Sequence, residues 1–178
     1  MKDIIFRKAE PSDIERIAEI YDAVHDTEEA GRQTTGWIRN VYPTKDTART
    51  ALALGDMFVE IYDGRIVAAA RINQEQVDVY AKIQWQFKAP EKSVMVLHTL
   101  VVDPAYRGRG FGEAFVDFYE AYALAHACPF LRIDTNARNT AARVMYKKLH
   151  YREAGIVGCV FNGIPDVQLI CLEKNLNF

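Results

Sequence analysis

Hydrophobic residues near the start of the chain recur at helical spacing. The apolar positions are Ile14, Ile17, Ala18, Tyr21 and Val24. Intervals of three and four residues predict one face of an amphipathic helix, and Ser12 with Glu15 has the spacing of a capping box that would begin it. We expect a short strand before this helix, over residues 4–7. An irregular loop over residues 25–43 should follow it, and then a second helix capped by Thr44.

The clearest turn signal lies between two short apolar segments. Residues 57–62 and 66–72 flank the dipeptide Asp63-Gly64, which readily takes the positive φ angles of a two-residue hairpin turn. The sequence therefore predicts a β-hairpin here. The next stretch, residues 75–92, mixes aromatic and polar side chains without a clear period, so no element is assigned to it.

The second half of the chain alternates between strand and helix patterns. A nearly continuous apolar run at residues 94–102 is typical of a strand that is buried on both faces. The remaining predicted elements are helices over 112–126 and 139–149 and strands over 131–134, 156–161 and 167–172. No repeat or linker divides the pattern, which predicts one α/β domain over residues 1–178 with a mixed central β-sheet flanked by helices.

Composition and charge narrow the classes of function. The chain has 178 residues, with 22 basic and 24 acidic side chains, so its formal net charge is −2. This balance argues against a broad nucleic-acid-binding surface. The three cysteines lack metal-ligand spacing, and no metal is expected. No apolar run reaches the length of a membrane span, and the first one is too short for a signal peptide. We expect a cytoplasmic protein with no membrane partner.

A glycine-rich segment carries the strongest chemical signal. The buried strand ends at Asp103-Pro104, and a loop with the sequence Arg107-Gly108-Arg109-Gly110-Phe111-Gly112 leads directly into a helix. Unpaired N–H groups at such a helix start bind phosphate oxygens, and glycines allow a ligand close to the backbone. Basic residues concentrate around the predicted site, at Arg107, Arg109, Arg138, Arg143, Lys147 and Lys148. The spacing is GxGxG rather than GxGxxG, so a Rossmann dinucleotide site fits poorly.

The two halves of this region resemble the signatures of the GNAT superfamily of N-acetyltransferases. The segment Arg107 to Gly112 is similar to the family's Arg/Gln-x-x-Gly-x-Gly/Ala motif. The segment Asn139 to Tyr151 is similar to its Asn-x-x-Ala-x-x-x-Tyr motif, although His150 stands where the family usually has glycine. Two motifs in the correct order are more specific than either alone. The resemblance implies a GNAT-like fold and transfer of an acetyl group from acetyl-CoA, as co-substrate, to an amine of a small molecule or of a protein.

The resemblance also implies roles for individual residues. The backbone amides of Arg107, Gly108, Arg109, Gly110, Phe111 and Gly112 would hold the pyrophosphate of coenzyme A. The strand residues Leu100, Val101 and Val102 would pair with its pantetheine arm, which the side chain of Asn139 would anchor. Tyr146 would donate a proton to the departing thiolate.

The attacking amine must lose a proton, and the sequence offers more than one route for it. His98 lies on the strand before the glycine loop, and an ordinary histidine pKa near 6.5 suits a base at neutral pH. A water chain is the alternative, and Glu91 and Asp103 are weaker candidates. In the loop over residues 25–43, the acidic pair Glu28 and Glu29 is a candidate for attracting a cationic acceptor.

Two other classes of function stay open at this stage. One is a noncatalytic acyl-CoA-binding sensor or interaction domain that keeps the fold and the coenzyme cleft. The other, less favoured, is a nucleotide-binding oxidoreductase. The acceptor amine is not identified by the sequence, and a homodimer is one oligomeric state compatible with it.

Overall fold

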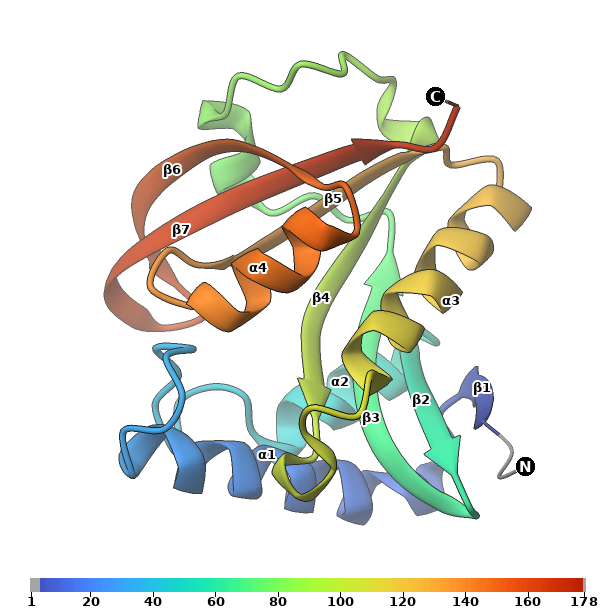
Figure 1. The fold of residues 1–178 in the computed structure, drawn as a ribbon, viewed down its shortest axis with the longest axis vertical. Helices are drawn as coiled ribbons and strands as arrows, with labels where there is room; N and C mark the ends of the chain where they lie inside the picture. Colours follow the sequence, from blue (N-terminus) through green and yellow to red (C-terminus); the bar gives the residue numbers. More distant parts are fainter. Residues whose placement is uncertain (1–3, 178) are drawn as a thin grey trace.

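Seven strands form one mixed β-sheet in the computed structural model, which describes residues 4–177 (Figure 1). The strand order is β1-β2-β3-β4-β5-β7-β6. The strands are β1 (Ile4–Lys8), β2 (Met57–Tyr62), β3 (Arg65–Asn73), β4 (Val94–Val102), β5 (Phe130–Asn136), β6 (Arg152–Phe161) and β7 (Ile164–Asn175). Neighbouring strands are antiparallel except β4 and β5, which are parallel. The predicted α/β class with a mixed central sheet is confirmed.

Helices cover both faces of this sheet (Figure 1). They are α1 (Ile14–Glu29), α2 (Lys45–Ala53), α3 (Phe111–Ala125) and α4 (Thr140–Lys148). The helices α1 and α2 bury one apolar cluster with β2 and β3, whereas α3 and α4 bury a second cluster on the opposite face. A third cluster lies beneath the segment between β3 and β4. Within residues 4–177, no helix is both long and apolar enough to cross a membrane.

Two predicted turns and caps are confirmed by the backbone geometry. Asp63 and Gly64 have φ angles of 53° and 74° between β2 and β3, as a two-residue hairpin turn requires. Thr44 caps α2 in a reciprocal capping box with Thr47. Both predictions rest on local backbone chemistry, which depends little on the rest of the fold.

The predicted start of α1 is wrong in its details. The residues that cap one another are Glu10 and Asp13, not Ser12 and Glu15, and they enclose a 3-10 turn at Pro11–Asp13. The Asp13 carboxylate accepts the Glu10 N–H at 2.7 Å and also binds the guanidinium of Arg7. This second partner favours Asp13 over Ser12, because a carboxylate stabilises both the cation and the free amide.

Several elements are longer than the sequence predicts. The helix α1 runs to Glu29 instead of ending before residue 25, because His25 and Thr27 are buried against the loop that follows. The strands β6 and β7 meet in a tight turn at Asn162-Gly163. That turn replaces the longer connection implied by the predicted strands over 156–161 and 167–172.

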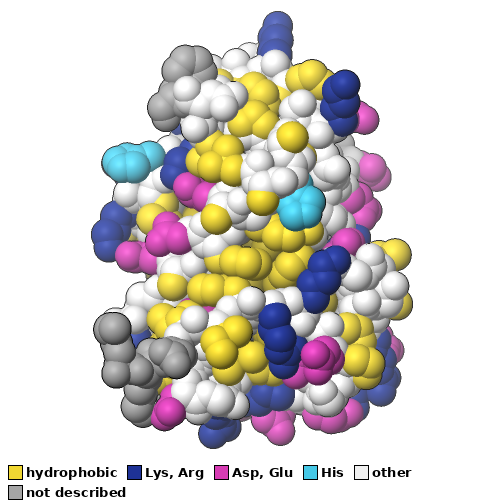
Figure 2. Space-filling model, turned by 90° about the vertical axis from the view of Figure 1, so that its right-hand side faces the viewer, with side chains coloured by type: hydrophobic (Ala, Val, Ile, Leu, Met, Phe, Trp, Pro, Cys, Tyr) yellow, Lys and Arg dark blue, Asp and Glu magenta, His cyan; other side chains and the backbone are white. Residues whose placement is uncertain are grey.

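One face of the molecule, formed by α3 and the edge strand β1, carries a band of hydrophobic side chains (Figure 2). Aromatic rings of β1, β2 and α3 also contact one another. The ring of Phe6 stacks on that of Phe118 with 4.7 Å between centroids, and Phe58 contacts Tyr122 at 4.9 Å. These contacts fix α3, and therefore the loop that begins it, against the sheet.

Candidate active site

The strands β4 and β5 pair along only part of their length (Figure 1). Parallel pairing joins four residue pairs, from Val94 with Phe130 to Leu97 with Ile133. Beyond this point Thr99 has a positive φ of 52°, and β4 diverges from β5. No described strand pairs with the β5-facing edge of residues 100–102. The sheet therefore offers unpaired backbone groups at its centre.

A cleft of about 980 Å³ opens at this divergence. Its walls come from β4, the glycine loop, α4, the end of β5 and the loop between α1 and α2. The predicted site residues that line it are His98, Leu100, Val101, Val102, Arg107, Gly108, Gly110, Phe111, Gly112, Asn139 and Tyr146. The structure thus brings together every predicted site residue except Arg109.

The glycine loop presents free backbone donors to the cleft. Gly108 and Gly110 have φ angles of 74° and 84°, and no described heavy atom lies within 4 Å of the position that a Cβ atom would take at either residue. Within residues 4–177, no acceptor is found for the backbone N–H groups of Gly108, Gly110 and Gly112. Because α3 begins at Phe111, these groups lie at the positive end of its dipole, where an anion binds favourably.

The predicted concentration of basic side chains is only partly realised. Arg107 lines the cleft, but the guanidinium of Arg109 lies over the rings of Tyr62, Tyr106 and Phe111, outside the cleft lining. Two further basic side chains are held by acids: Arg143 pairs with Glu153, and Lys148 pairs with Glu113. Aromatic rings and nearby carboxylates therefore bind these cations in place of a ligand in the cleft.

The second motif forms the start and inner face of α4. Asn139 caps this helix: its Oδ1 accepts the Ala142 N–H at 3.3 Å, and its Nδ2 donates to the Thr135 hydroxyl at 3.1 Å. Tyr146 is buried, with its ring 5.6 Å from that of Tyr151. Burial first, and the negative charge of Asp134 second, raise the pKa of Tyr146 above its usual value. Its hydroxyl therefore keeps its proton at neutral pH.

His98 lines the cleft, but its environment weakens it as a base. Its Nε2 lies 2.9 Å from Oδ1 of Asn73. Burial, assisted by the positive charge of Arg71, lowers the pKa of His98 to about 4. The imidazole is therefore neutral at physiological pH and has low proton affinity. The weaker candidates Glu91 and Asp103 lie outside the cleft lining, and Asp103 binds the guanidinium of Arg16.

A carboxylate that the sequence analysis did not single out lies at the same divergence. Asp134 follows Ile133 on β5 and lines the cleft, and its Oδ2 accepts the Tyr80 hydroxyl at 2.7 Å. Burial raises the pKa of Asp134 to about 6, although the bond from Tyr80 opposes this rise. A carboxylate with this pKa is a suitable base near neutral pH. The sequence signal that points to Asp134 is the alternation of polar residues with the apolar Leu131 and Ile133 along this strand.

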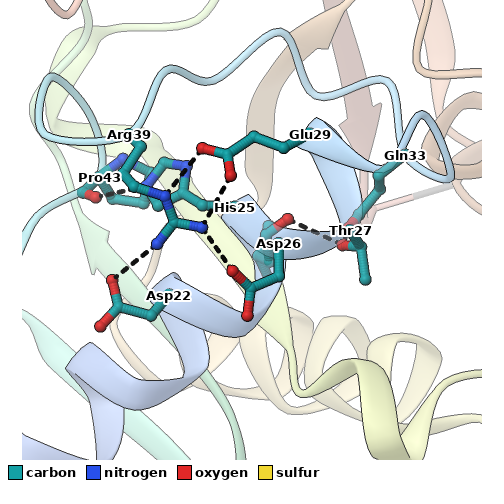
Figure 3. Close-up of polar contacts among 9 residues, drawn as sticks. Asp22, His25, Asp26, Thr27, Glu29, Gln33, Arg39 and Pro43 are labelled. Carbon is teal, nitrogen blue, oxygen red and sulfur yellow. Dashed lines mark hydrogen bonds and ion pairs between the residues drawn. The ribbon is translucent and has the colours of Figure 1, made fainter.

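The loop between α1 and α2 forms one wall of the cleft and is held from behind by α1 (Figure 3). Arg39 binds three acidic side chains of α1, namely Asp22, Asp26 and Glu29. The Glu28 carboxylate accepts the backbone N–H groups of Thr35 and Gly36. The predicted acidic pair Glu28 and Glu29 therefore holds the loop in place, and neither residue lines the cleft.

The two ends of the cleft differ in charge. The lining residues Arg32 and Arg107 lie near one another beside the glycine loop, where Arg107 donates to the Arg32 carbonyl at 3.4 Å. On the α2 side the lining carries two carboxylates, Asp46 and Glu75, and one guanidinium, that of Arg71. Among residues 4–177, no group of three or more His, Cys, Asp or Glu side chains could hold a metal ion.

Comparison with protein families gives one match. The model of the Acetyltransferase (GNAT) family matches residues 17–151, about three quarters of the chain. An acetyltransferase of Yersinia pestis is 44% identical over 52 residues, which are 29% of this chain and 37% of that protein. The aligned segment thus spans just over a third of the length of this relative.

Solved structures share the fold at low sequence identity. A GNAT-family acetyltransferase from Streptococcus agalactiae is similar with a TM-score of 0.80 and 22% identity, over 97% of this chain and 95% of that one. The protein yncA of Salmonella typhimurium, solved with its cofactor acetyl-CoA, is similar with a TM-score of 0.67 and 16% identity, over 97% and 94%.

Proposed function

Because this chain belongs to the GNAT family of acetyltransferases, we propose that it transfers an acetyl group from acetyl-CoA to a primary amine of a small molecule or protein. The observation that carries the proposal is the divergence of β4 and β5. The resulting cleft connects the free amides of the glycine loop with Tyr146 and Asp134. An anion site, an unpaired strand edge and two proton-transfer groups thus lie along one continuous cavity.

The residues around the cleft fit coenzyme A. The free N–H groups of Gly108, Gly110 and Gly112 suit its pyrophosphate, and Arg107 adds a positive charge nearby. The unpaired edge of residues 100–102 suits the amide groups of its pantetheine arm, as an added strand would. Asn139 keeps one free lone pair and one free N–H for that arm. When bound, acetyl-CoA supplies a thioester as the acetyl donor.

Proton transfer is assigned to two side chains of the cleft. Asp134 accepts a proton from the amine, because only a neutral amine has the lone pair needed for attack. Tyr146 donates a proton to the departing thiolate, since its raised pKa keeps the hydroxyl protonated until then. His98 is the alternative base, acting directly or through water. The pKa of Asp134 is about 6, whereas that of His98 is about 4, so Asp134 is the better candidate for the base.

The charge of the cleft supports an amine as acceptor. On the side away from the glycine loop, Asp46 pairs with Arg49 and Glu75 pairs with Arg71, whereas Asp134 has no cationic partner among the described residues. Alkyl amines are mostly protonated near pH 7, so the Asp134 carboxylate attracts them into the cleft. The acceptor would lose its proton only on reaching Asp134.

Two measurements test this function. Titration calorimetry of the purified chain with coenzyme A should show binding, and absence of binding would refute the proposal at its first step. A screen of small amines and amino-terminal peptides with acetyl-CoA should then show acceptor-dependent thiol release. Coenzyme binding with no release across the whole screen would favour a noncatalytic acyl-CoA sensor instead.

A further inference from the structure

The segment between β3 and β4, which the sequence pattern leaves unassigned, is held firmly on the sheet. We call residues 76–87 the strap. The buried carboxylate of Glu173 on β7 accepts the backbone N–H groups of Gln86 at 2.9 Å and Phe87 at 3.2 Å. The Arg132 guanidinium of β5 lies 4.1 Å from the ring centre of Trp85. Charge-assisted bonds of this kind are stronger than neutral ones, so the far end of the strap is fixed in position.

The strap carries one buried tyrosine toward the catalytic end of β5. Tyr80 lies in the 3-10 turn Asp78–Lys82 and is 3% exposed. Its backbone carbonyl accepts the indole N–H of Trp85 at 3.1 Å, and the two rings are in edge contact at 5.2 Å. Its hydroxyl donates to Oδ2 of Asp134. Trp85 therefore connects the anchored end of the strap to the tyrosine that contacts Asp134.

Tyr80 and Asp134 differ in their access to the cleft. Asp134 lines the cleft, whereas Tyr80 is absent from the cleft lining. The Tyr80 hydroxyl thus contacts the carboxylate from behind. Among the described residues, Tyr80 is the one hydrogen-bond donor to the Asp134 side chain.

We propose that Tyr80 is a positioning residue of this active site: it fixes the Asp134 carboxylate in one orientation from behind the cleft and favours its ionised form. This inference rests on the proposed function, in which Asp134 is the base. A donor held by packing restricts carboxylate rotation, and it stabilises the anion more than the neutral acid. The strap thereby sets the pH at which the base becomes active.

The other titratable groups near Asp134 lie on four further elements. Tyr42 comes from the α1–α2 loop and Tyr146 from α4, and Asp134 acts on the pKa of each. Cys159 of β6 and Cys171 of β7 are affected by it in the same way. All four are neutral at physiological pH, since burial raises their pKa values. In the described part of the chain, none of the four donates a hydrogen bond to Asp134, and the Tyr42 hydroxyl is already bonded to Thr99.

The kinetic test compares Tyr80→Phe with the matched variant Tyr119→Phe. Tyr119 is also buried, and its hydroxyl donates to the Met95 carbonyl at 2.6 Å, away from Asp134. We expect Tyr80→Phe to move the acid limb of the kcat profile upward by about one to two pH units, with little change in the KM of the amine. Tyr119→Phe should leave the limb unchanged. A Tyr80→Phe limb that coincides with the wild-type limb would overturn the inference.

A second measurement separates this inference from the proposed function. The Asp134 carboxyl can be titrated by carbon-13 NMR in the purified protein, with its signal assigned by Asp134→Asn, and this requires no turnover. A higher carboxyl pKa in Tyr80→Phe than in wild type supports the role of Tyr80 even if no acceptor is acetylated. An unchanged pKa in a correctly folded variant, judged by its circular dichroism, refutes that role even if acetyl transfer is observed.

Discussion

A buried carboxyl group away from the cleft should make the stability of the chain depend on pH. Glu60 lies on β2 and has no solvent exposure, and neither of its carboxyl oxygens has a hydrogen-bond partner among the described residues. Its neighbours on the same strand face, Phe58 and Tyr62, contact aromatic rings of α3. This apolar burial raises the pKa of Glu60 from 4.5 to about 8. The group is therefore protonated in the folded state at neutral pH.

The sign of the effect follows from proton linkage. Above pH 4.5 the unfolded chain releases the Glu60 proton, whereas the folded chain holds it up to about pH 8. Between these two pH values, folding is accompanied by uptake of a proton at Glu60, so stability falls as the pH rises. Each pH unit costs about 1.4 kcal/mol, so the contribution of Glu60 to stability should fall by roughly 3 kcal/mol between pH 4.5 and 7. For a chain of this size, that corresponds to roughly 6–12 °C in Tm.

The variant Glu60→Gln removes the titration while keeping the shape of the side chain. Differential scanning calorimetry from pH 4.5 to 8.5 should show similar Tm values for variant and wild type at the acidic end. The variant should become progressively more stable than wild type toward pH 8. Glu173→Gln is the matched control, since Glu173 is equally buried but accepts bonds from Gln86, Phe87 and Arg152. This control should destabilise the fold. Parallel Tm curves for Glu60→Gln and wild type would refute the reasoning.

Three further predictions concern the cleft. Tyr146→Phe should lower kcat by about 10² to 10⁴ with little change in coenzyme affinity by calorimetry, because only the acid is removed; an unchanged rate would remove Tyr146 from that role. Asp134→Asn should lower kcat by about 10² to 10⁴ and abolish the acid limb near pH 6 in the pH profile of kcat/KM. His98→Ala should keep that limb. The reverse result would make His98 the base. Gly110→Ala should weaken coenzyme binding, since alanine is strained at a φ of 84° beside the free amides. Gly55→Ala, at a φ of 73° after α2 and outside the cleft lining, should lower Tm and leave coenzyme affinity unchanged.

Local backbone chemistry accounts for the features that the sequence predicts correctly. The Asp63-Gly64 turn, the Thr44 cap and the continuous apolar run of β4 each depend on residues that lie close together in the chain. His150 also behaves as its position after α4 suggests: it takes the positive φ of 66° that glycine would accept more easily.

Contacts between distant segments account for the features that the sequence does not predict. The strap has no hydrophobic period of its own, because Glu173, which holds its far end, lies 87 positions along the chain from Gln86. Arg109 carries the charge expected at a phosphate site, yet its guanidinium lies over the ring of Tyr62 on β2. Asp134 becomes a candidate base only once the divergence of β4 from β5 gives it access to the cleft.

That divergence also means that β1 to β4 and β5 to β7 are joined within the sheet by four residue pairs between β4 and β5. A ligand bound along residues 100–102 should therefore stabilise the folded chain, since a ligand that binds only the folded state shifts the folding equilibrium toward it. Backbone amides of β4 and β5 should then exchange more slowly with solvent deuterium when the ligand is bound, and Tm should rise with ligand concentration.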